Sequence, residues 1–115
     1  YIYVDEHQSV YVADTFNHRV MKWDKDARVG KIAARGSVRG FFVDPAGNVY
    51  VAGYHDHKIM RWSKEGASQE VTVRYLEPDE ERQVFMPWSI CCDQQRTKIF
   101  VGDHTKQRVQ CFPLA

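Results

Sequence analysis

Short runs rich in β-branched and aromatic residues recur along the whole chain, and turn-forming residues separate them. The clearest runs are residues 10–13, 49–52 and 99–102. Short runs of β-branched and aromatic residues between turns are typical of β-strands, in which successive side chains point to opposite faces. The pattern predicts an all-β chain of short antiparallel strands.

The strands belong to a repeat. Three segments align with one another, at residues 3–23, 42–62 and 91–112. In each, a short apolar strand ends in an aspartate: Asp5, Asp44 or Asp93. A tight turn, an alternating strand, a polar turn and a third strand follow. A repeat of this length and pattern predicts blades of a β-propeller, each with four antiparallel strands, rather than a helical solenoid.

The repeat divides the chain unevenly. We expect blade one at 1–36, blade two at 37–74, a loop at 75–85 and an incomplete blade three at 86–115. A weaker fourth strand is expected around 31–34 in the first blade and 70–73 in the second. At about 42 residues per blade, the chain supplies about 2.7 blades. Because closed propellers generally have about 4 to 8 blades, this is a partial propeller.

Several residues carry a resemblance to a known family. Residues 10–14, Val-Tyr-Val-Ala-Asp, followed by Asn-His-Arg-Val at 17–20, resemble the NHL repeat. Residues 86–90 are similar to its Pro-x-Gly-Ile lead-in, with Ser89 in place of glycine. The resemblance covers nearly the whole chain and implies a TolB-like propeller with six blades. The chain would then be a fragment of that propeller, and self-assembly of several chains into a ring is the alternative.

The same resemblance implies structural ion pairs between the end of the second strand and the start of the third. These pairs are Asp14 with Arg19 and Asp103 with Arg108. A planar guanidinium can hold a carboxylate with two hydrogen bonds across a turn. The second of the three aligned segments departs from this pattern, because it has Gly53 and Lys58 at these positions.

The apolar residues favour strands, because aromatic and β-branched types are common and Leu76 and Leu114 are the only leucines. Aromatic residues recur at two positions of the repeat. We expect these six to form the repeat core: Tyr11, Trp23, Tyr50, Trp62, Phe100 and Phe112.

The net charge of the chain is close to zero and does not favour a nucleic-acid partner. Sixteen basic residues against fifteen acidic residues give a formal charge of +1. Because phosphate binding relies on basic excess, we do not expect nucleic acid to be the partner. An RNA-binding NHL domain stays open as an alternative, in which bases would stack on Tyr54, Phe16 and Trp88, and Arg39 and Arg35 would neutralise phosphates. No apolar run approaches the roughly 18 residues of a membrane span, so no such span is predicted.

Candidate chemistry is sparse. His55 and His57 could share one side of an extended segment, but no nearby spacing completes a metal site. The thiols of Cys91, Cys92 and Cys111 are odd in number, and we expect them to be buried. No catalytic residue, metal site or cofactor is predicted.

We therefore expect an interaction scaffold rather than an enzyme. Loops at one end of the ring would bind a protein partner. The resemblance implies a role such as substrate recognition in a ubiquitin-ligase-like protein. The alternatives are a metal-dependent lactonase or lyase-type propeller, with Asp5, Asp44 and Asp93 as nearest ligand candidates, and the RNA-binding domain. The sequence predicts no cellular compartment.

Overall fold

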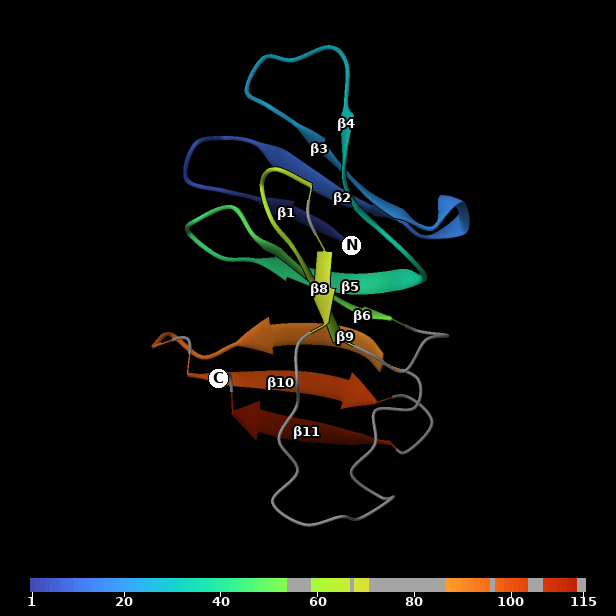
Figure 1. Ribbon diagram of the computed structural model, residues 1–115, viewed down its shortest axis with the longest axis vertical. Coiled ribbons are helices and arrows are strands. Elements are labelled where there is room, and N and C mark those ends of the chain that lie inside the picture. The colour runs from blue at the N-terminus through green and yellow to red at the C-terminus, as the bar shows by residue number, and fades with distance from the viewer. Residues whose placement is uncertain (54–58, 67, 71–86, 96, 104–106, 114–115) are drawn as a thin grey trace.

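The computed structural model describes residues 1–53, 59–66, 68–70, 87–95, 97–103 and 107–113, with only the backbone at 69, 70, 87, 88 and 103. These residues form three antiparallel sheets, stacked along the longest axis of the molecule (Figure 1). This arrangement confirms the predicted all-β class and the partial propeller.

Each sheet is a meander in which neighbours in the chain are neighbours in space. Sheet one comprises β1 (Ile2–Val4), β2 (Val10–Asp14), β3 (Arg19–Trp23) and β4 (Lys31–Arg35), with the 3-10 turn η1 (Thr15–Asn17) between β2 and β3. Sheet two comprises β5 (Val38–Val43), β6 (Val49–Gly53), β7 (Ile59–Trp62) and β8 (Ser68–Glu70). Sheet three comprises β9 (Pro87–Cys92), β10 (Lys98–Asp103) and β11 (Arg108–Pro113).

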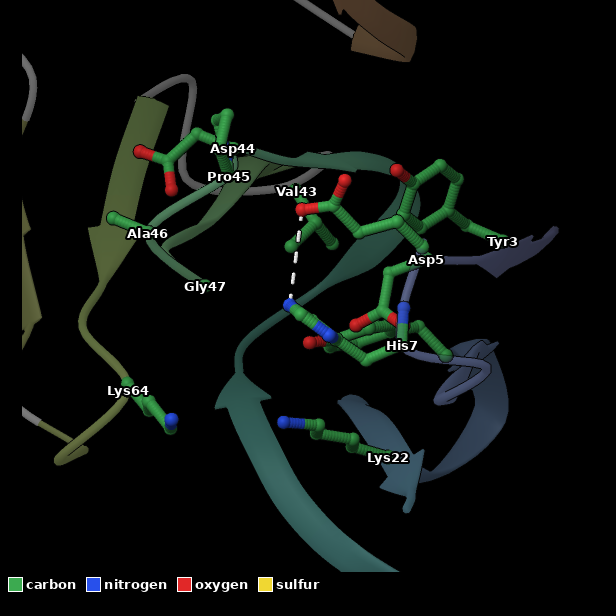
Figure 2. Close-up of a pocket in the computed structure, with 12 residues that line it drawn as sticks. Tyr3, Asp5, His7, Lys22, Val43, Asp44, Pro45, Ala46, Gly47 and Lys64 are labelled. Carbon is green, nitrogen blue, oxygen red and sulfur yellow. Dashed lines mark hydrogen bonds and ion pairs between the residues drawn. The ribbon is translucent and has the colours of Figure 1, made fainter. Parts of the chain in front are cut away.

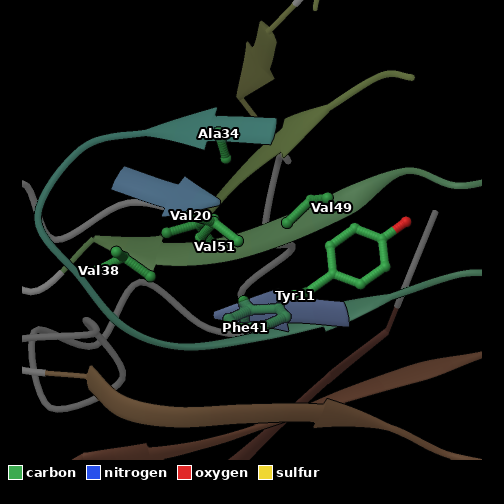
Figure 3. Close-up of a cluster of buried hydrophobic side chains, with 7 residues drawn as sticks. All are labelled: Tyr11, Val20, Ala34, Val38, Phe41, Val49 and Val51. Atoms are coloured by element: carbon green, nitrogen blue, oxygen red, sulfur yellow. The ribbon is translucent and has the colours of Figure 1, made fainter. Parts of the chain in front are cut away.

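The first core lies between sheets one and two. Alternate side chains of each strand point into it, because successive side chains of a strand point to opposite faces. Its members are Tyr11, Val20, Ala34, Val38, Phe41, Val49 and Val51 (Figure 3). The rings of Tyr11 and Phe41 meet across the two sheets, with centroids 6.3 Å apart.

A second core lies between sheets two and three. It contains Ala52, Ile59, Ile90, Ile99, Val101 and Phe112, with Phe42 packed against it. Sheet two is therefore covered on both faces, and every residue of its strand β6 is buried. A strand buried on both faces explains why residues 49–52 are apolar at every position.

The far faces of sheets one and three are apolar but have no covering sheet among the described residues. Strand register places these side chains together on the outer face of sheet one: Ile2, Val4, Val10, Val12, Met21, Trp23 and Ile32. The outer face of sheet three carries Cys91, Phe100, Val109 and Cys111. Both outer faces carry aliphatic and aromatic side chains, as do the two cores buried between the sheets.

The exposure of the thiols corrects one expectation. Cys91 and Cys111 are exposed and Cys92 is half-buried, so the prediction of buried thiols was wrong for the first two. Cys91 and Cys111 flank Phe100 in the register of sheet three. They point away from the second core, and burial of these thiols would require another sheet on that face.

The strand bounds refine the expected fourth strands. In sheet one, β4 covers Lys31–Arg35, close to the expected position. In sheet two, β8 begins at Ser68, two residues before the expected start, and is described to Glu70. The loop predicted at 75–85 lies outside the described residues.

Candidate functional site between the first two sheets

A cleft opens between sheets one and two where their tight turns lie side by side (Figure 2). It consists of two adjoining cavities of about 230 Å³ and about 140 Å³. Both cavities are lined by Tyr11, Lys22, Gly47 and Lys64. We call these two cavities together the inter-sheet cleft.

The lip of the cleft is made by two turns that aspartate side chains close. Asp5 Oδ1 accepts hydrogen bonds from the backbone N–H groups of His7, at 2.9 Å, and Ser9, at 2.8 Å. Asp44 Oδ1 accepts one from the N–H of Asn48 at 2.9 Å, and Asp44 Oδ2 accepts one from Asn48 Nδ2. Such bonds fix the loop backbone. The lip is therefore held in one conformation by short-range contacts.

The third repeat aspartate has the same geometry. Asp93 Oδ1 accepts hydrogen bonds from the N–H groups of Thr97, at 2.7 Å, and Lys98, at 3.0 Å. The Thr97 hydroxyl donates to Asp93 Oδ2, and together these bonds hold the pKa of the Asp93 carboxyl below its ordinary value. Among the described residues, no group of three or more His, Cys, Asp or Glu side chains comes together as metal ligands. The repeat aspartates hold turns in this structure.

The floor of the cleft is Tyr11 with Lys22. The side chain of Lys22 is only 15% exposed, and its ammonium lies 5.4 Å from the centre of the Tyr11 ring. Burial raises the pKa of the Tyr11 hydroxyl, which stays neutral and can donate a hydrogen bond. Burial alone would lower the pKa of Lys22, but its hydrogen bond with Tyr11 and the nearby Asp24 carboxylate leave that pKa raised. Lys22 therefore carries a positive charge into the cleft.

The opposite wall carries Lys64, which lies in the turn after β7. That turn is closed by a hydrogen bond from the Gly66 N–H to the Ser63 carbonyl at 2.9 Å. The alkyl chain of Lys64 lies over Gly47, where an added Cβ would be 3.7 Å from Lys64 Cδ. Figure 2 shows the Lys22 and Lys64 side chains projecting toward the same gap from opposite sides.

The two cavities differ in charge. The larger one is mixed, because Asp5, Glu6 and Asp44 line it together with His7 and the two lysines. An exposed contact of 3.7 Å joins Glu6 Oε1 to His7 Nε2. The smaller cavity is lined by Lys22, Lys31 and Lys64, and by no acidic residue among those that the structure describes.

The ion pairs expected from the repeat lie at the opposite end of the sheets. Arg19 Nε donates to Asp14 Oδ2 at 2.9 Å. This bond, with a second from Asn17, holds the pKa of Asp14 below its ordinary value. Asp103 and Arg108 are partners in the register of β10 and β11, but the side chain of Asp103 lies outside the described part of the chain.

The six expected core aromatics fall into two groups. Tyr11, Tyr50 and Phe112 are buried, whereas Trp23, Trp62 and Phe100 are half-buried. Trp62 packs against the first core, while Trp23 and Phe100 lie on the outer faces of sheets one and three. Other residues considered from the sequence lie outside the described part: Tyr54, His55, His57 and Lys58.

Sequence analysis did not identify Lys22 and Lys64 as site residues. Lys22 alternates with Met21 and Trp23, so it falls on the face of β3 that carries the core residue Val20. A charged residue at an inward position was the available signal. Lys64 carried no such signal, because it lies in a turn and reaches the cleft only when two sheets pack together.

Among the residues that the structure describes, no helix is both long enough and apolar enough to cross a bilayer.

No known protein family matches the chain, and no curated protein sequence matches it. Solved structures do resemble it. An auxiliary nutrient binding protein from Bacteroides thetaiotaomicron superimposes with a TM-score of 0.74 and 17% identity, covering 96% of this chain and 36% of that one. Virginiamycin B lyase from Staphylococcus aureus gives 0.64 and 17%, covering 98% of this chain and 40% of that one. A streptogramin B lyase gives 0.65 and 13%, covering 98% and 39%.

These neighbours are propeller-like proteins, and the match extends over nearly all of this chain. The chain spans less than half the length of each of them. At these identities the likeness establishes the fold alone. The protein is thus part of a β-propeller, with three blades represented by its three sheets.

Proposed function

We propose that the chain is part of an NHL-type propeller that acts as a protein-interaction scaffold. The observation that carries this proposal is the inter-sheet cleft, which opens beside two rigid turns at one end of the sheets. Loops on a rigid frame are a usual place for partner contacts. Substrate recognition within a ubiquitin-ligase-like protein is the finer form of the proposal, and any ligase activity would come from another domain.

Several features support a binding surface over an enzyme. Asp5, Asp44 and Asp93 already accept hydrogen bonds from their own turns, which makes them poor candidates for a shared metal site. The smaller cavity is lined by Ser63 and three lysines but, among the described residues, by no histidine or carboxylate that could serve as a general base. The near-zero net charge also argues against RNA as the partner.

A site-specific photocrosslinker tests the proposal. Ala46 is exposed on the lip of the cleft, whereas Phe16 is exposed at the opposite end of the sheets. A benzophenone amino acid at position 46 of the full chain should capture a defined protein in cell extract. The same group at position 16 is the matched control and should not capture that protein. Equal capture at both positions, or none at 46, would contradict the proposed surface.

A further inference from the structure

We propose that the inter-sheet cleft binds a single side-chain carboxylate of a partner protein, held between the ammonium groups of Lys22 and Lys64. This inference rests on the proposed scaffold function and names the chemistry that the scaffold would recognise. The partner segment is acidic at one position and apolar around it.

The smaller cavity is lined by three lysines and by no acidic residue among those described. Lys31 Nζ lies 2.9 Å from Asp24 Oδ2, and Lys22 Nζ lies 3.5 Å from Asp24 Oδ1. The single carboxylate of Asp24 therefore forms ion pairs with two lysines. None of the ion pairs between described residues involves Lys64, and its neighbour Glu65 lines neither cavity. The cavity keeps an uncompensated positive charge, which an anion would neutralise.

The donors are also held in place. Tyr11 is fully buried and fixes the floor, and the Lys22 side chain is packed along its ring. Gly47 gives the alkyl chain of Lys64 a surface to lie on. The Lys22 side chain is only 15% exposed, and an ion pair with a partly buried ammonium is stronger than one between fully exposed side chains. A carboxylate entering here would meet the ammonium groups of Lys22 and Lys64.

Size and surroundings favour one carboxylate over a densely charged ligand. The smaller cavity, about 140 Å³, accommodates the end of a side chain. The larger cavity at its mouth is mixed, because Tyr3, Val43 and Pro45 line it beside the carboxylates of Asp5, Glu6 and Asp44. Asp5, Glu6 and Asp44 would together repel the successive phosphates of a nucleic acid. A peptide with one acidic side chain among apolar neighbours satisfies both parts of the cleft.

Peptide binding to the full chain tests the inference directly. The probes are fluorescein-labelled nonapeptides with a central glutamate flanked by apolar and aromatic residues, each paired with the same peptide carrying glutamine. Fluorescence anisotropy should show about tenfold tighter binding of the best glutamate peptide, with affinity falling as salt is raised. Equal affinity of glutamate and glutamine peptides would overturn the inference.

Variants locate the binding. K64Q and K22M should each lower the affinity for the glutamate peptide about five- to tenfold. Neither should change the affinity for the glutamine peptide appreciably. K25Q is the matched control, because Lys25 is exposed and lines neither cavity. Lys64 is exposed, so K64Q should keep the wild-type melting curve and remains informative if K22M unfolds. Loss of affinity in K25Q equal to that in K64Q would overturn the proposed location.

Two further measurements distinguish a carboxylate ligand from a phosphate ligand. Inorganic phosphate at millimolar concentration should not displace the glutamate peptide, and a phosphoserine peptide should bind no better than its glutamate counterpart. Displacement by phosphate or tighter phosphopeptide binding would replace the carboxylate assignment with a phosphate one. If the Ala46 crosslinker captures a partner whose binding K64Q does not change, the scaffold function holds and this inference fails.

Discussion

Ile59 and Val109 occupy the same position of successive repeats, yet Ile59 is 2% exposed and Val109 is 72% exposed. Ile59 points into the second core, whereas Val109 lies on the outer face of sheet three. The difference is not one of residue type, because both are β-branched and apolar. It arises because sheet three covers Ile59 and no described sheet covers Val109. The outer faces are thus surfaces of the kind that another blade covers.

Substitution of Val109 should change how the chain associates. We expect residues 1–115 alone to self-associate through the outer faces, since contiguous apolar surface favours association. Val109→Lys should lower the mass measured by light scattering on a sizing column. Val29→Lys, at an exposed position in the β3–β4 loop, is the matched control and should leave the mass unchanged. A wild-type chain that stays monomeric would contradict this prediction, and a discrete dimer would favour ring closure by two chains.

Phe41 should be among the most sensitive positions for stability. Its side chain is 0% exposed, and its ring meets Tyr1 edge-on at 5.1 Å and Tyr11 at 6.3 Å. Phe41→Ala would leave a cavity between sheets one and two and should lower the free energy of unfolding by about 3–5 kcal/mol. Phe16→Ala, at a side chain 94% exposed, should change it by less than about 0.5 kcal/mol. Urea unfolding of both variants checks this, and similar losses in the two would contradict it.

The turn role of the repeat aspartates is testable at Asp44. Asp44→Ala removes the acceptor for the Asn48 N–H and should lower the free energy of unfolding by about 1 kcal/mol. Asp44→Asn keeps an oxygen acceptor and should lose less than half of that. Urea unfolding measures both changes. If the alanine and asparagine variants lose the same free energy, the hydrogen bond is not what stabilises the turn.

Much of this fold could be predicted from the sequence, because the decisive signals are local. The β-branched and aromatic runs at 10–13 and 49–52 predicted strands, and their recurrence predicted the blades of a propeller. The exposure of Cys91 could not be predicted, since burial on a sheet face depends on what packs against it. The same holds for the cleft. Lys22 and Lys64 are far apart in sequence, and only the packing of two sheets brings them to one opening.

The Asp14–Arg19 pair should make stability depend on acid pH. The hydrogen bond from Arg19, with that from Asn17, lowers the pKa of Asp14 from its ordinary value of 3.8. The pair's contribution is therefore present above that ordinary value and is lost as pH falls through the lower folded-state pKa. Wild type should be more stable than Asp14→Asn at pH 6, and the difference should vanish toward pH 2. Unfolding at several pH values measures it, and the same profile in both proteins would contradict the pair's role.

Position 30 should not tolerate a side chain, because the Trp23 ring occupies the space that its Cβ would need. A Cβ added at Gly30 would lie 2.5 Å from Trp23 Cε2 and 2.8 Å from Cζ2, so Gly30→Ala would push the indole out of place. We expect a loss of about 1–3 kcal/mol in the free energy of unfolding. The loss should shrink in a Trp23→Phe background, because the smaller ring leaves room for the methyl group.

A double-mutant cycle by urea unfolding separates this contact from a backbone effect. Gly66 is the matched control, since its φ is +91° and an added Cβ would meet nothing within 4 Å. Gly66→Ala should be destabilising because of backbone strain, by the same amount whether residue 23 is Trp or Phe. If Gly30→Ala also loses the same free energy in both backgrounds, the indole is not the constraint. Coupling confined to Gly30 would show that Trp23 is held at a fixed place on the outer face of sheet one.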